Sequence, residues 1–181
     1  MMRVLCEHPR RASARRFTVF RDHTPERWTP RMGIELSLAA QDDLPAIRDL
    51  VRRSGLSPRG LEQSRWVFKA TQAGRLIGAG AIDILGPYAL CRSLAVEPGQ
   101  RRGGVGGMLV RRWVDTCQVG RLDAYLVTRR WHAPYFARFG FRVVPKSSTP
   151  PEVRRHWQLA SFLYAVPFRP FLCVMERKLA S

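Results

Sequence analysis

The sequence predicts an α/β protein with a mixed central sheet and helices on both faces of that sheet. Short apolar runs alternate along the chain with segments whose apolar residues recur at helical spacing. One such helical set comprises Leu44, Ile47, Leu50 and Val51. A strand-like run at Tyr88–Val96 leads through a glycine-rich turn into a further helical segment. Strands and helices that alternate in this way favour a sheet covered by helices on two sides.

Each element follows from its local pattern. Apolar or alternating runs predict strands at Ile34–Leu38, Trp66–Ala70, Leu76–Leu85, Tyr88–Val96, Arg121–Val127, Phe141–Val144 and Phe171–Arg177. Helices are predicted over the Leu44–Val51 stripe, Met108–Cys117 and Pro134–Phe139, with a short helix or loop over Ser57–Ser64. We expect Asp42 or Asp43 to cap the first helix, with Pro45 in its first turn. Gly74 and the Gly86–Pro87 pair supply turns between strands.

Composition bounds the class of protein. The 181 residues are 45% hydrophobic, which suffices for one domain with a core. No apolar run is long enough to span a bilayer, so no membrane partner is expected. The formal net charge is +17, but all basic residues except Lys69, Lys146 and Lys178 are arginines spread along the chain. Because no single basic block forms, we do not expect specific nucleic-acid binding.

The cysteines indicate the compartment. Cys6, Cys91, Cys117 and Cys173 are widely separated and show no paired spacing. A disulfide framework or a metal site is therefore not expected, and a cytoplasmic protein without a metal is the prediction.

A boundary is predicted near Met32. Residues 1–31 hold eight arginines and three prolines without a sustained period, so we interpret them as an Arg-rich extension, either disordered or upstream of the natural start at Met32. An organellar targeting peptide is an alternative, although serines are few. Residues 32–181 then form the folded domain.

The turn at residues 101–107 contains Arg101, Arg102, Gly103, Gly104, Val105, Gly106 and Gly107. Glycines let a backbone approach a ligand closely, and a helix that begins there points free N–H groups at it. The arginines add positive charge, so the turn is predicted to bind a phosphate or pyrophosphate. Its spacing does not match a Walker loop, which needs a lysine, or a dinucleotide fingerprint, because Leu109 stands where the third glycine belongs.

Two motifs carry a resemblance to a known family. The first is Arg101-x-x-Gly104-x-Gly106 preceded by Leu94-Ala95-Val96-x-Pro98, and the second is the aromatic run at residues 133–141, APYFARFGF. In this order they resemble the acetyl-CoA-binding motifs of the GNAT N-acetyltransferase superfamily. The resemblance implies a GNAT-like sheet whose strand before the turn splays from its neighbour and binds acetyl-CoA. Leu94, Ala95 and Val96 would then pair with the pantetheine arm, and residues 101–107 would hold the pyrophosphate.

Asp83 is the candidate catalytic base for such a transfer. Direct acetylation of an amine needs a proton acceptor for the amine and no covalent enzyme intermediate, so Cys91 and Cys117 need not act as nucleophiles. Asp83 lies in the apolar run AGAIDIL, where an acid needs a task or a partner. The alternative for Asp83 is an edge-strand carboxylate that points to solvent, and Glu97 is the second candidate base.

The candidate acid departs from the family pattern. Many GNAT enzymes place a tyrosine four residues before the glycine of the second motif, and this chain has Phe136 there. Either Tyr135 or a water replaces that donor, or the thiolate leaves unassisted.

The segment at residues 145–170 is an insertion relative to a plain GNAT hairpin and bears on the acceptor. Together with the strand LCRSLAV at residues 90–96 it resembles the arsenic-resistance branch of GNAT proteins. Members of that branch acetylate small anionic amino-acid-like compounds such as arsinothricin or phosphinothricin. Arg92, Trp157 and Gln158 are therefore candidate substrate contacts, and Arg129 or Arg130 would suit an anionic acceptor. The alternatives are a protein or peptide N-acetyltransferase and a catalytically weak acyl-CoA-binding module. A homodimer is a further implication of the resemblance.

Overall fold

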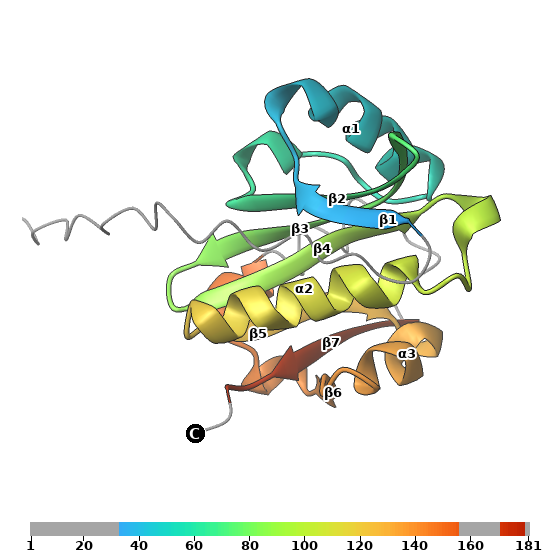
Figure 1. The fold of residues 1–181 in the computed structure, drawn as a ribbon. Helices are drawn as coiled ribbons and strands as arrows, with labels where there is room; N and C mark the ends of the chain where they lie inside the picture. Colours follow the sequence, from blue (N-terminus) through green and yellow to red (C-terminus); the bar gives the residue numbers. More distant parts are fainter. Residues whose placement is uncertain (1–32, 156–170, 180–181) are drawn as a thin grey trace, which may run out of the picture.

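The computed structural model describes residues 33–155 and 171–179, which include a seven-stranded sheet and the α-helices that cover it (Figure 1). The strands are β1 (Ile34–Leu38), β2 (Trp66–Gln72), β3 (Arg75–Leu85), β4 (Tyr88–Val96), β5 (Asp123–Arg129), β6 (Arg142–Val144) and β7 (Leu172–Arg177). The α-helices are α1 (Leu44–Arg53), α2 (Val105–Val119) and α3 (Ala133–Ala137). The predicted extension at 1–31 and the second part of the insertion, residues 156–170, lie outside the described residues.

The sheet is mixed, as predicted. Its spatial order is β1-β2-β3-β4-β5-β7-β6, and the first four strands are antiparallel neighbours. Helix α2 then carries the chain over to β5, which pairs parallel with β4. Strand β7 lies between β5 and β6 and is antiparallel to both. The parallel β4–β5 pair therefore sits in the middle of the sheet, next to the start of α2.

Helices cover both faces, because successive strand residues point to opposite sides. On one face α1 buries Ile47, Leu50 and Val51 in a cluster with Ala79, Ala81 and Ala95 of the sheet. On the other face α2 packs Leu109, Val110 and Trp113 into the larger cluster, to which Phe136 of α3 also belongs. The GNAT-like α/β architecture predicted from the sequence is confirmed.

Two glycines of β3 set how closely α2 approaches the sheet. A Cβ at Gly78 would lie 2.8 Å from Val105 Cγ1, and a Cβ at Gly80 would lie 2.6 Å from Cζ2 of Trp113. Both distances are shorter than a normal carbon–carbon contact. Helix α2 thus packs directly on the backbone of β3 and brings its first turn to the level of β4.

The expected cap of α1 is wrong in detail. Asp43 occupies the N-cap position and Pro45 lies in the first turn, but the Asp43 carboxylate makes no capping hydrogen bond to the helix. It accepts hydrogen bonds instead from the backbone N–H of Ala40 at 2.7 Å and from Lys69 Nζ of β2 at 2.6 Å. The acid therefore joins the start of α1 to the sheet.

Candidate functional site

The turn between β4 and α2 has a backbone that exposes amide groups. After the 3-10 helix η3 (Pro98–Gln100), Arg102 has a φ of +68° and Gly104, the N-cap of α2, has a φ of +87°. Residues 101–104 are exposed. The first N–H groups of α2 have no intrahelical acceptor, and the positive end of the helix dipole lies among them. This arrangement suits a pyrophosphate, as the sequence predicted.

The last two glycines of the turn face aromatic side chains of the second motif, most closely at Gly106. A Cβ at Gly106 would lie 2.8 Å from the hydroxyl oxygen of Tyr135, and one at Gly107 would lie 3.5 Å from Cζ of Phe139. Tyr135 and Phe139 stack edge to face at 5.5 Å between ring centroids. The second motif thus packs on the first turn of α2 through these glycines, which connects the two motifs in space.

Strands β4 and β5 part beside this turn. Their pairing runs only from Tyr88↔Asp123 to Cys91↔Leu126, whereas β4 continues to Val96. Ser93, which has a φ of +57°, lies near an irregularity in the β3–β4 register. The backbone of Leu94 and Ala95 follows in the part of β4 that β5 no longer pairs, which is the splay that the family resemblance implied. The Val96 carbonyl accepts a 3.3 Å hydrogen bond from Arg101 Nε in this structure.

Asp83 lies on β3, inside the sheet, so the solvent-facing edge carboxylate is not what the structure has. Its side chain is 15% exposed, and Oδ2 accepts a hydrogen bond from Arg92 Nη1 of β4 at 3.0 Å. Oδ1 is buried and has no hydrogen-bond partner among the described residues. A buried carboxylate oxygen without a donor loses its hydration uncompensated. Oδ1 is therefore an unpaired acceptor inside the described part of the structure.

Glu97, the second candidate base, is engaged elsewhere. Its carboxylate accepts hydrogen bonds from Arg53 of α1 at 2.8 and 3.3 Å. The Arg53 guanidinium accordingly lowers the pKa of Glu97 below its ordinary value. The ion pair ties the end of β4 to α1, which suits a structural role better than proton transfer.

The two adjacent aromatic residues of the second motif have different positions: Phe136 lies in the core and Tyr135 lies at the turn. Phe136 is 8% exposed and belongs to the large cluster, where its ring meets Phe141 edge to face. Tyr135 places its hydroxyl over Gly106, and burial raises the pKa of that phenol. Tyr135 is therefore the nearest described hydroxyl donor to the first turn of α2 in this motif, whereas Phe136 supports the core.

The other candidates have different surroundings. Arg129 ends β5, and its guanidinium carbon lies 5.6 Å from the ring centre of the exposed Trp131. Trp157 and Gln158 lie outside the described residues. Sequence reasoning missed the contact between Arg92 and the loop before η2 (Leu61–Gln63), where the Arg59 carbonyl accepts a hydrogen bond from Arg92 Nη2. No local signal in the sequence marks a backbone acceptor of this kind.

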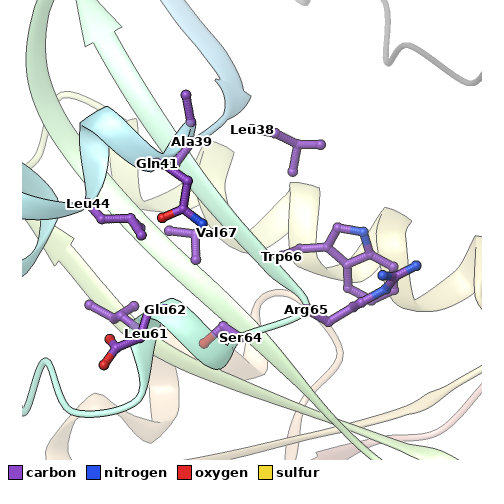
Figure 2. Close-up of a pocket in the computed structure, with 11 residues that line it drawn as sticks. Leu38, Ala39, Gln41, Leu44, Leu61, Glu62, Ser64, Arg65, Trp66 and Val67 are labelled. Atoms are coloured by element: carbon purple, nitrogen blue, oxygen red, sulfur yellow. The ribbon is translucent and has the colours of Figure 1, made fainter.

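A cavity of about 380 Å³ lies where β1 ends and β2 begins (Figure 2). Its lining combines apolar side chains with the polar side chains of Gln41 before α1, Glu62 in η2, and Ser64 and Arg65 before β2. The lining residues are Leu38, Ala39, Ala40, Gln41, Leu44, Leu61, Glu62, Ser64, Arg65, Trp66 and Val67. Asp83, Arg92 and the 101–107 turn are not among them, so the cavity is distinct from the candidate site.

The structure thus places a glycine turn at a helix start beside a parallel strand pair that separates. Residues 63–143 match the family model described as the acetyltransferase (GNAT) domain. The matched segment runs from the end of η2 to β6 and includes the glycine turn, α2 and α3, so this part of the chain is similar to a GNAT acetyltransferase domain. No curated protein sequence is significantly similar to the chain.

Solved structures share the fold at low sequence identity. Rv2747 from Mycobacterium tuberculosis, solved with CoA, is 22% identical, with a TM-score of 0.65 over 80% of this chain and 99% of that one. N-acetylglutamate synthase from Neisseria gonorrhoeae, complexed with coenzyme A and N-acetyl-glutamate, is 19% identical, with a TM-score of 0.68 over 82% of this chain. This chain spans only 35% of that synthase. The ribosomal-protein-S18-alanine N-acetyltransferase from Escherichia coli is 18% identical, with a TM-score of 0.62 over 82% of this chain and 96% of that one.

Two further features concern residues 33–155 and 171–179. None of the helices there has the length and apolar character needed to cross a membrane. The same residues hold no group of three or more His, Cys, Asp or Glu side chains placed to bind a metal ion.

Proposed function

We propose that this protein transfers the acetyl group of acetyl-CoA directly to the amine of a small, anionic, amino-acid-like compound. One observation carries the proposal: the exposed residues 101–104 and the first N–H groups of α2 lie beside the split between β4 and β5, and the buried Asp83 carboxylate lies on the strand next to β4. The first feature suits a pyrophosphate followed by an extended arm, and the second suits an amine.

The residues of this region fit coenzyme A. Leu94, Ala95 and Val96 offer strand backbone on the side that β5 leaves unpaired, where an extended amide chain can add as a strand does. Residues 101–107 offer helix-start amides and two guanidinium groups for the pyrophosphate. Acetyl-CoA supplies an activated acetyl thioester when it is bound.

Asp83 is the residue that we assign to the acceptor amine. Its carboxylate would accept a proton from the acceptor's ammonium, directly or through a water, and the resulting neutral amine would attack the thioester carbon. The C–N bond then forms as the C–S bond breaks, and coenzyme A leaves as its thiolate, which takes a proton from Tyr135 or from water. Cys91 and Cys117 are both buried, and burial raises the pKa of the Cys91 thiol, so neither is suited to act as a nucleophile. Tyr135 is the side chain best placed to supply a hydroxyl near the turn.

The anionic acceptor is supported by charge and by the resemblance to the arsenic-resistance branch. The chain has a net charge of +17, and Arg129 and Arg130 follow the open end of β5. Phosphinothricin is thus a suitable first probe for the acceptor. Three further points stay predictions: substrate contacts at Trp157 and Gln158, a cytoplasmic location, and a homodimer. Sedimentation of the purified protein tests the homodimer.

A specific observation favours a second candidate function. The tyrosine slot of the second motif holds the buried Phe136, which suits a protein that binds acyl-CoA and turns it over slowly. The two functions differ in whether any amine releases the thiol of coenzyme A.

A thiol-release assay with acetyl-CoA tests the proposal across amines that include phosphinothricin, acidic amino acids and N-terminal peptides. We expect turnover with a small anionic amine and a loss on the order of 10²-fold or more in kcat for Asp83→Asn. Asp42→Asn, which changes an exposed carboxylate, is the matched control and should retain full activity. Turnover only with peptides would favour a protein acetyltransferase, and tight binding of coenzyme A without turnover on any amine would favour the second candidate.

A further inference from the structure

We propose that Arg92 is a positioning residue, which holds Asp83 and the loop before η2 in place, rather than a contact for the acceptor's anionic group. The inference rests on the proposed function, because it gives Asp83 a defined geometry toward an amine. It follows from the contacts that the Arg92 guanidinium already makes with Asp83, Arg59 and Ser93.

All three nitrogen atoms of the Arg92 side chain donate within the protein. Nη1 donates to Asp83 Oδ2 at 3.0 Å, Nη2 donates to the Arg59 carbonyl, and Nε lies 3.4 Å from Ser93 Oγ. An arginine that binds a carboxylate or phosphonate usually presents two parallel N–H groups to it. Here the two terminal nitrogens of Arg92 donate to two different partners, Asp83 on β3 and Arg59 in the loop before η2. Arg92 therefore does not present two parallel N–H groups to a ligand.

The charge around Arg92 also favours a positioning role over contact with an anionic group. Its side chain is 21% exposed and forms an ion pair with a carboxylate that is 15% exposed. The pair has no net charge, so it offers little attraction to an anion. The half-buried Arg129 and the exposed Arg130 lie at the other side of the strand split and are better placed to provide that attraction.

The register of the sheet explains the pairing. Asp83 lies opposite Leu90 and Arg92 lies opposite Ala81, so the two charged residues are diagonal neighbours on one face. This face also carries Ala81, which belongs to the cluster that α1 and Leu61 bury. Arg92 therefore lies between the base on β3 and the loop that follows α1.

The loop is shaped around the guanidinium. Gly60 has a φ of +71°, and a Cβ there would lie 3.6 Å from Arg92 Nη1. Leu61, the next residue, is 1% exposed and anchors η2 in the core. The hydroxyl of Ser64 lies 3.4 Å from the Gly60 carbonyl and closes the turn. This turn holds the Arg59 carbonyl at Arg92. The guanidinium therefore links the loop to Asp83 on β3.

The consequence for Asp83 is that one oxygen is fixed and the other is left for the acceptor. Arg92 engages Oδ2, and Oδ1 is buried without a partner in the described part of the chain. If Arg92 were removed, the carboxylate could rotate, and Oδ1 would no longer be held toward the amine. Misplacement of a reacting group by about 1 Å lowers a rate on the order of 10²-fold.

Kinetics of Arg92→Gln and Arg92→Lys test this role, with acetyl-CoA and phosphinothricin, or the best amine of the panel, as the probes. We expect kcat to fall on the order of 10²-fold in Arg92→Gln, with the KM for the amine changed by less than about threefold. Arg92→Lys should be intermediate, because one ammonium can reach Asp83 or the Arg59 carbonyl but lacks the geometry of the guanidinium. Arg111→Gln, an exposed arginine on α2, is the control. A rise of about tenfold or more in the KM for the amine with kcat retained would make Arg92 a substrate contact and overturn the proposal.

A second readout does not need catalysis. Amide hydrogen exchange of residues 57–64 should be faster in Arg92→Gln than in the wild type and in Arg111→Gln, because the loop loses its link to β4. Unchanged exchange there overturns the positioning role, even if the wild type acetylates no tested amine and the proposed function has failed by itself. If Arg92→Gln does not fold, Gly60→Ala replaces it, since a Cβ at a φ of +71° strains the backbone of the loop that holds the Arg59 carbonyl at Arg92. Normal kcat and normal loop exchange in Gly60→Ala would then contradict the proposal.

Discussion

At the scale of single residues, the ion pair between Asp43 and Lys69 shows how a charge joins two distant parts of the chain. The two side chains are 27% and 24% exposed and lie 2.6 Å apart. Hydrogen bonds from Lys69 and from the Ala40 N–H lower the pKa of Asp43 below its ordinary value. The folded-state pKa is thus below the unfolded value of about 3.9, so the pair stabilises the fold above that pH and loses its effect as the pH falls through the folded-state pKa.

The Asp43→Asn variant should therefore lower the free energy of unfolding at pH 7 by about 0.5–1 kcal/mol. Urea denaturation at neutral pH and at about pH 2.5 measures the difference, which should shrink toward zero at the lower pH. Asp42→Asn, the neighbouring exposed carboxylate, is the control. An equal loss of stability at both pH values would show that the charge of Asp43 is not what matters.

Gly106 and Tyr135 should be energetically coupled. A Cβ at Gly106 meets the Tyr135 hydroxyl oxygen at 2.8 Å but the ring carbon Cζ only at 3.8 Å. Alanine is a better helix former than glycine, so Gly106→Ala should be more favourable with Phe at position 135 than with Tyr, by about 0.5–1 kcal/mol. A double-mutant cycle of thermal unfolding measures this coupling, and additive effects within error would contradict the contact.

Some single-residue features could be predicted from the sequence and others could not. Asp83 was identifiable because an acid in an apolar strand is unusual, and the structure places it buried within the sheet. Its partner Arg92 depends on the β3–β4 register, which includes an irregularity between Ala79 and Ala81 that no local pattern reveals. The sequence suggested that Gly106 allows close approach of a ligand, whereas its nearest neighbour is the Tyr135 side chain from much later in the chain.

At the scale of elements, strand bounds agree best where breakers flank the strands. Strands β1 and β4 have the predicted limits, with Gly33 before the first and Gly86–Pro87 before the second. Helix α2 begins at Val105, three residues before the predicted Met108. Gly106 and Gly107 have poor helix propensity, but contact with Tyr135 and Phe139 of the second motif outweighs that propensity.

The approach of α2 to β3 gives an element-scale prediction. Gly80→Ala should lower the free energy of unfolding by about 1–3 kcal/mol, because the new Cβ would lie 2.6 Å from Trp113, which is 1% exposed. Gly99→Ala is the matched control, since a Cβ at that position would meet nothing within 4 Å and the φ of Gly99 is not positive. Urea denaturation compares the two variants, and equal stabilities would mean that α2 does not pack on β3 as described.

The attachment of β6 to β7 gives a second element-scale prediction. Glu176 of β7 has a side chain that is 6% exposed and accepts hydrogen bonds from Arg142 of β6 at 2.7 and 3.0 Å and from the Tyr125 hydroxyl of β5 at 3.3 Å. Arg142→Gln leaves the buried carboxylate with weaker donors and should cost about 1–3 kcal/mol. Thermal unfolding measures the loss, with Arg111→Gln as the control; no difference would show that Arg142, which is 68% exposed, adds little.

At the scale of the whole molecule, the two sequence motifs are placed as one unit. The glycine turn precedes α2, the aromatic motif forms α3, and the two pack together through Gly106 and Gly107 next to the split between β4 and β5 (Figure 1). Order along the chain was therefore enough to predict the fold. The acceptor side depends on long-range contacts of Arg92 and on side chains from several elements, and these arise only from the complete fold.

Hydrogen–deuterium exchange with and without coenzyme A tests the central claim, which is that the turn and the open part of β4 bind acetyl-CoA. We predict that coenzyme A slows amide exchange within residues 94–107, above all at the first N–H groups of α2, which have no intrahelical acceptor. The cavity lined by Leu61 and Trp66 should show no comparable change. Binding of coenzyme A that leaves residues 94–107 unprotected would contradict the site described for this protein.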